Sequence, residues 1–133
     1  MITKAPLLAS LLFGTLLAAC ATTPMAAEQL GPSKWQIVNI DGAAPVSPRA
    51  SVEFLPDRIS ASAGCNGLGG SWEAKDGRLI TGPFMSTMMF CDGLMEQERA
   101  LAGLFESKPA YVLSGEWLVL EGGGHKVELR KAK

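Results

Sequence analysis

The chain has 133 residues, with 12 basic and 13 acidic side chains and a formal net charge of −1 at pH 7. This length suits one folded domain with short accessory segments. Because the sequence contains no basic stripe or charge run, its composition excludes a typical nucleic-acid-binding surface.

The first 20 residues are organised like a secretory signal. Lys4 is their only charge, residues 5–17 are almost wholly apolar, and the sequence Leu-Ala-Ala-Cys ends at Cys20. A charged start, an apolar segment of roughly 7–15 residues and small residues at the cut are typical of a signal peptide, whereas a spanning helix needs about 20 apolar residues. Leu-Ala-Ala-Cys also resembles the lipobox of bacterial lipoproteins. We therefore predict a signal peptide over residues 1–19 and lipidation of Cys20; the alternatives are an ordinary signal peptide cut elsewhere and a buried core helix.

Lipidation of Cys20 would also determine where in the cell the protein is held. In lipoproteins the cysteine sulfur receives diacylglycerol and the new N-terminus is usually acylated, for example with palmitate, and two or more chains anchor a protein stably. Lipoproteins kept in the inner membrane often carry Asp after the cysteine, where this chain has Ala21. The resemblance therefore indicates the cell envelope, in the inner leaflet of the outer membrane and facing the periplasm. Residues 20–32 are small and polar, which predicts a flexible tether before a domain over residues 33–133.

Short apolar segments separated by turn signals follow the tether. Asp41-Gly42 and Asp76-Gly77 are strong turn signals, and residues 64–70 form a glycine-rich stretch that predicts a loop. In this half of the chain we predict strands over residues 34–40, 51–55, 59–63, 71–74, 78–81 and 84–90.

The period of the apolar residues changes after Gly93. Apolar side chains then recur at helical spacing, at Leu94, Leu101, Leu104 and Phe105. We predict a helix over about residues 93–107, with Asp92 as its N-cap and Pro109 beyond its end. Further strands are predicted over residues 110–113, 116–120 and 125–130.

The order of these elements predicts the fold class. The chain has a group of strands, one helix and a second group of strands. Parallel sheets instead come from strands and helices that alternate along the chain. We therefore predict an α+β domain, in which an antiparallel sheet or partly closed barrel of about seven to eight short strands curves around the helix.

Two cysteines, Cys65 and Cys91, follow the lipidation site. An exported compartment permits disulfides, and an even pair in a small domain favours a Cys65–Cys91 bridge, which would stabilise the fold by roughly 3–4 kcal/mol. The alternative is a redox-active pair, but these cysteines lack the C-x-x-C spacing that tunes thiol reactivity.

Other side chains are only weak candidates for metal binding or catalysis. Thioethers bind Cu(I), so Met85, Met88, Met89 and Met95 are a candidate copper site, although methionine also fills irregular cores and we favour that interpretation. His125 is the only histidine, and with a free cysteine it would suggest nucleophilic catalysis, but the expected disulfide leaves no free partner. We therefore assign no catalytic, metal or cofactor residue, and we expect no cofactor and no enzyme activity.

The glycine-rich loop and its surroundings favour a structural role. Asn66 suits hydrogen bonding to backbone in a tight loop, and a ligand-binding nest is the alternative. The loop lacks the spacing of a phosphate motif. Thr87 and Glu98 are candidates for a capping or packing contact near the start of the helix.

Several of these residues together resemble the META domain, the family of the heat-inducible HslJ-type lipoproteins. The similar positions include Trp35, Gly64-Cys65-Asn66, Gly70-Ser71-Trp72, Thr87, Met89 and Cys91 in a Thr-x-Met-x-Cys pattern, Met95 and Glu98. The resemblance covers residues 33–130. It implies an antiparallel sheet curved around a helix, an envelope location and a link to heat and drug stress. It implies no accepted activity and no catalytic residues.

These inferences combine into one functional expectation. We expect a lipid-anchored, monomeric, non-catalytic envelope protein that supports resistance to heat or drug stress by binding another envelope protein or ligand, without nucleic acid. The alternative is a proteinaceous inhibitor of a secreted or periplasmic hydrolase.

Overall fold

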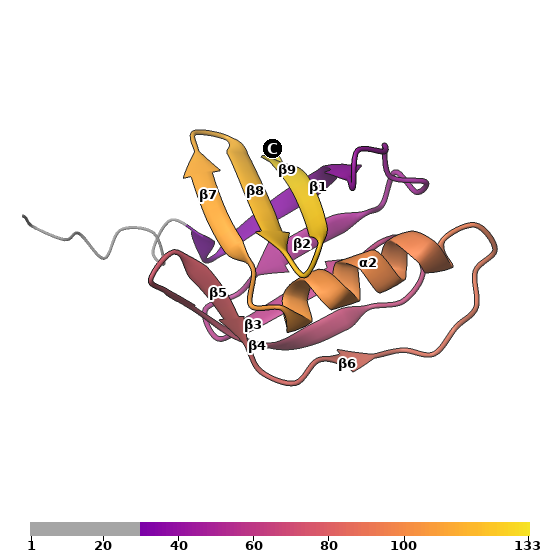
Figure 1. Cartoon of the computed structure of the whole chain (residues 1–133), viewed down its shortest axis with the longest axis horizontal. Coiled ribbons are helices and arrows are strands. Elements are labelled where there is room, and N and C mark those ends of the chain that lie inside the picture. Colours follow the sequence, from indigo (N-terminus) through magenta and orange to yellow (C-terminus); the bar gives the residue numbers. More distant parts are fainter. Residues whose placement is uncertain (1–29) are drawn as a thin grey trace, which may run out of the picture.

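The computed structural model describes residues 30–133 (Figure 1). The predicted signal peptide, Cys20 and most of the predicted tether lie outside these residues. Strands and the helix α2 form in this order: β1 Ser33–Ile40, β2 Ser51–Phe54, β3 Arg58–Ser62, β4 Leu68–Lys75, β5 Arg78–Thr81, β6 Met85–Ser86, α2 Met95–Glu106, β7 Ala110–Ser114, β8 Trp117–Gly122 and β9 His125–Lys131. Within residues 30–133, no helix has the length and apolar character needed to cross a membrane.

The strands form one closed antiparallel barrel. Hydrogen-bonded neighbours follow the order β3-β2-β1-β9-β8-β7-β5-β4, and β3 also pairs with β4, which closes the ring. The short strand β6 lies outside this ring, because it pairs with β4 alone and ends the sheet order. The predicted α+β barrel of antiparallel strands is therefore confirmed, while the expectation that the sheet curves around the helix stays a prediction.

The predicted tight turns are present at both Asp-Gly pairs. Asp41 and Gly42 have φ values of 51° and 87°, and Asp76 and Gly77 have 52° and 74°. Two consecutive positive φ values are the requirement of a type I′ hairpin turn, which matches the twist of the flanking strands. Asp tolerates this conformation better than most residues and Gly adopts it freely, so the sequence encodes these turns locally.

The core lies between the inner faces of the strands and one face of α2. Its largest fully buried side chains are Trp35, Phe54, Phe105, Leu30, Ile37, Ile59, Leu79, Leu101, Leu104, Leu118, Leu120 and Leu129. Phe105 packs edge-on against Phe84, with ring centroids 5.2 Å apart. Burial of Leu101, Leu104 and Phe105 confirms the apolar face that the helical period predicted. Leu30 has no exposed surface, so packing of the domain includes a residue from the segment predicted as a tether.

Three local predictions are wrong. The strand predicted over residues 84–90 is reduced to Met85–Ser86, because only a short part of β4 is available to pair with it. The loop predicted over residues 64–70 ends earlier, since β4 already begins at Leu68. Asp92 does not cap the helix: α2 has Leu94 at its N-cap position, without a side-chain hydrogen bond, and Gly93 at φ 76° separates Asp92 from it.

Candidate functional site

The buried side chain of Asn66 is the centre of a polar network between the β3–β4 loop, the segment after β6 and α2. Its Oδ1 accepts hydrogen bonds from Thr87 Oγ1 and from the backbone N of Met89, each at 2.8 Å. Its Nδ2 donates to the carbonyl of Met89 at 2.8 Å and to Glu98 Oε1 at 2.6 Å. A side-chain amide can accept two bonds and donate two, so the hydrogen-bonding capacity of Asn66 is fully used.

Glu98 reaches this network from the first turn of α2. Its side chain is buried, and its carboxylate also accepts the backbone N–H of Asn66, at 3.3 Å. A buried carboxylate is costly unless hydrogen bonds compensate for lost water, and Asn66 supplies two of them. Thr87 and Glu98, which we expected to contact each other, are joined through Asn66 instead.

The predicted Cys65–Cys91 disulfide is present beside the network. The two Cα atoms are 6.0 Å apart, and the bridge spans 26 positions of sequence. The residue before it, Gly64, has φ +114°, and a Cβ at this position would lie 2.2 Å from the Cβ of Ser47. Only glycine fits there, so the Gly-Cys-Asn sequence is explained by packing, bridging and hydrogen bonding at three successive residues.

These contacts hold an exposed apolar segment, residues 85–90, which we call the Met loop. Met85, Met88, Met89 and Phe90 expose 80%, 95%, 57% and 80% of their surface. The prediction that the methionines pack in the core is therefore wrong for Met85, Met88 and Met89. Met95 differs, because it is partly buried and its Sδ accepts the backbone N–H of Cys91 at 3.5 Å. The sequence alone does not distinguish the exposed methionines from the partly buried Met95, since thioether side chains occur both in cores and on binding surfaces.

An open recess of about 330 Å³ lies beside the Met loop. Its lining comes from β3, β4, β6 and the residues next to β4 and β6, and consists of Arg58, Ser60, Gly67, Leu68, Gly69, Met85, Ser86 and Thr87. Of these, only Arg58 carries a charge. In residues 30–133 the His125–Asp41 pair is the only ion pair, so Arg58 is not neutralised by a carboxylate there.

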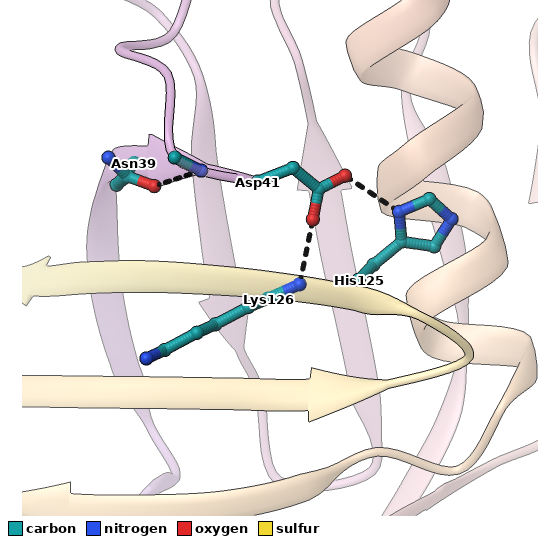
Figure 2. A network of polar contacts seen from close by, with 5 residues as sticks. Asn39, Asp41, His125 and Lys126 are labelled. Carbon is teal, nitrogen blue, oxygen red and sulfur yellow. Dashed lines mark hydrogen bonds and ion pairs between the residues drawn. The ribbon is translucent and has the colours of Figure 1, made fainter.

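Asp41 and His125 form a second polar cluster (Figure 2). His125 Nδ1 lies 2.7 Å from Asp41 Oδ2, and the backbone N of Lys126 donates to Asp41 Oδ1 at 2.8 Å. Burial alone would raise the pKa of the Asp41 carboxyl, but the hydrogen bonds from His125 and Lys126 and the charge of His125 outweigh it and lower that pKa. The cluster joins the turn after β1 to the β8–β9 hairpin.

The geometry does not bring His125 together with a cysteine. Both cysteines of the described domain are bridged, and the hydrogen-bond partner of His125 is Asp41. A Cβ on Gly103 would lie 3.4 Å from His125 Nε2, so the imidazole also lies against α2. The sequence indicates Asp41 only as a turn residue, and this pairing is not predictable from it, because the two residues are 84 positions apart. Within residues 30–133, no three His, Cys, Asp or Glu side chains are grouped to hold a metal ion.

Comparisons with known proteins agree with this fold. One solved NMR structure of a protein superposes with a TM-score of 0.71 and 20% sequence identity, over 78% of this chain and 92% of the other. The NMR structure of a protein from Burkholderia xenovorans has a TM-score of 0.63 and 21% identity, over 99% of both chains. At these identities the likeness concerns the fold alone. No curated protein matches the sequence significantly. A comparison with protein families matches residues 28–133 to the META domain, and the chain therefore belongs to the META domain family.

Proposed function

We propose that this protein is a lipid-anchored envelope protein of the HslJ type, held in the outer membrane through Cys20 and facing the periplasm. It is non-catalytic and supports resistance to heat or drug stress by binding another envelope component. The proposed binding surface is the Met loop.

One observation carries this proposal: the family-motif residues around Asn66 support an exposed apolar surface. Four large apolar side chains of the Met loop are more than half exposed, while Asn66 and Glu98 beneath them are buried. Contiguous exposed apolar residues are a feature of binding surfaces, because their contact with water is unfavourable until a partner covers them.

The polar network adds a second argument for binding. The backbone of Met89 is fixed at both its N–H and its carbonyl by Asn66, and the disulfide fixes the segment at Cys91. A surface that is already ordered loses less conformational entropy when it binds, so its contacts contribute more to affinity. The side chains of the motif thus favour a binding role over a chemical one.

Site-specific photo-crosslinking tests the proposal in living cells. A photoreactive residue replaces Met88 in the full-length chain, and in a control chain it replaces Val112, which is 63% exposed on β7. We expect one envelope protein to be crosslinked from position 88 and not from position 112. Equal crosslinking from both positions, or none from position 88, would contradict the proposal.

A further inference from the structure

The Met loop presents three thioether groups to solvent. The side chains of Met85, Met88 and Met89 expose between 57% and 95% of their surface. Met95, the other methionine of residues 30–133, differs from them, because its side chain is partly buried and its Sδ accepts the backbone N–H of Cys91 at 3.5 Å. Three sulfur atoms are therefore open to small reagents, and a fourth, nearby in sequence, is held against the fold.

An exposed thioether reacts with oxidants that transfer an oxygen atom, such as hypochlorous acid. The sulfur attacks the oxygen of this acid, an S–O bond forms, the O–Cl bond breaks, and the products are methionine sulfoxide and hydrogen chloride. The sulfur loses two electrons and the chlorine gains them. Free thiols would compete for the oxidant, but both cysteines of residues 30–133 are joined in the disulfide. The exposed thioethers of the Met loop are therefore the most reactive groups of the described domain toward this oxidant.

The fold tolerates oxidation at these positions. A sulfoxide is polar and disrupts packing when it forms in a core, but these three side chains lie outside the core. The segment is held by other groups: Met89 bonds to the side-chain amide of Asn66 through its backbone N–H and carbonyl, and the backbone N of Thr87 donates to the carbonyl of Gly67 at 3.3 Å. None of these bonds uses a thioether sulfur. Oxidation therefore changes the polarity of the surface and leaves the backbone of the loop in place.

We propose that Met85, Met88 and Met89 are an oxidative modification site, at which oxygen transfer to the thioethers releases the partner of the Met loop. The inference rests on the proposed function, because it concerns regulation of the same surface. These methionines supply three of the four large apolar side chains that the loop exposes, so their conversion to sulfoxides removes most of its apolar character. A bound partner covers the same sulfur atoms, and binding and oxidation therefore exclude each other.

Peptide mass spectrometry of the purified full-length chain, treated with increasing amounts of hypochlorous acid, tests the modification site. We expect sulfoxide to form about tenfold faster at positions 85, 88 and 89 than at Met95, which is the internal control, because susceptibility follows exposure. Thermal unfolding followed by circular dichroism should give the same melting temperature before and after this treatment. Equal oxidation at all four positions, or loss of the folded signal, would overturn the proposal.

Photo-crosslinking from a fourth position of the loop tests the effect on binding. A photoreactive residue replaces the exposed Phe90 in the full-length chain, which is added to envelope membranes before or after treatment with hypochlorous acid. The treated chain should crosslink to its envelope partner about tenfold less. The matched control carries Met85→Leu, Met88→Leu and Met89→Leu, which keep the volume and the apolar surface without an oxidisable sulfur. This variant should crosslink equally before and after treatment.

The outcomes separate this inference from the proposed function. Equal crosslinking by the treated and untreated chains would refute the inference and leave the proposed function standing. An equal loss in the leucine variant would also refute it, because the oxidant would then act at another group. If the untreated chain crosslinks to no envelope protein, the proposed function fails, and release of a partner by oxidation fails with it.

Discussion

At the scale of single residues, Asn66 joins three other residues of the family motif. Its one side chain binds Thr87, Met89 and Glu98, residues that are 21 to 32 positions away in sequence. The sequence predicts a structural Asn in a tight loop and a contact near the start of the helix. It does not predict that these are the same interaction, because nothing in the pattern measures the distance between the loop and Glu98.

Replacing Asn66 by Asp should therefore be strongly destabilising. The substitution keeps the shape of the side chain, removes the Nδ2 donors and places a second carboxylate 2.6 Å from the position that Glu98 Oε1 occupies. We expect a loss of about 2–4 kcal/mol in the free energy of unfolding at pH 7, measured by urea denaturation. Asn39→Asp is the control, because Asn39 only accepts a bond, from Gly42 N, and Asp accepts it equally well. Equal losses for both variants would argue against the network.

Asp41 should make the stability depend on pH in the acid range. Its pKa is lowered from 3.8 in the folded protein, so the ionised carboxylate stabilises the fold above pH 3.8 and loses this effect as the pH falls through its folded pKa. Asp41→Asn should thus lower the free energy of unfolding at pH 6, and the difference from the unsubstituted chain should shrink below pH 3.8. Denaturation at a series of pH values measures both, with Asp57→Asn, in the exposed turn after β2, as control. A difference that stays constant down to pH 2 would contradict the lowered pKa.

At the scale of elements, strands were predictable from the sequence where an alternating apolar pattern stands next to a clear turn signal. β1, β5 and β9 lie close to their predicted ranges, since an apolar period and an Asp-Gly or Gly-rich turn occur together at each. Residues 84–90 are as apolar as a core strand, yet only Met85–Ser86 form a strand, and residues 85–90 form the exposed Met loop. Apolar content predicts a strand, but a strand also needs a neighbour along its length, and sequence does not state how far β4 extends.

The disulfide should mainly restrain local opening of the Met loop. Cys65 and Cys91 join the loop before β4 to the residues that enter α2. In the Cys65→Ser, Cys91→Ser double variant we expect the free energy of unfolding to fall by roughly 3 kcal/mol and cleavage within residues 85–94 to become faster. Limited proteolysis with mass spectrometry locates the cleavage, and the β8–β9 hairpin is the internal control. Cleavage that increases equally at both places would indicate general loosening instead.

At the scale of the whole molecule, the start of the described chain and the segment after β6 lie apart. β1 begins toward one end of the long axis, whereas the segment between β6 and α2 turns at the other end (Figure 1).

Lipidation itself has a direct test. We expect the protein isolated from the bacterial outer membrane to lack residues 1–19 and to carry diacylglycerol and one further acyl chain on Cys20, as measured by intact mass. Cys20→Ala should leave the signal peptide uncleaved or release an unlipidated chain. A mature protein that begins at another residue and carries no lipid would contradict the anchored location.

The central claim, that the Met loop is the surface through which the protein acts, is tested most directly by survival of the host bacterium. The measurement compares strains whose chromosomal copy carries Met88→Lys or the control Val112→Lys, after heat or drug exposure and at equal protein levels. We predict that Met88→Lys survives no better than a deletion strain while Val112→Lys survives like the parent. Full survival of the Met88→Lys strain would contradict the claim.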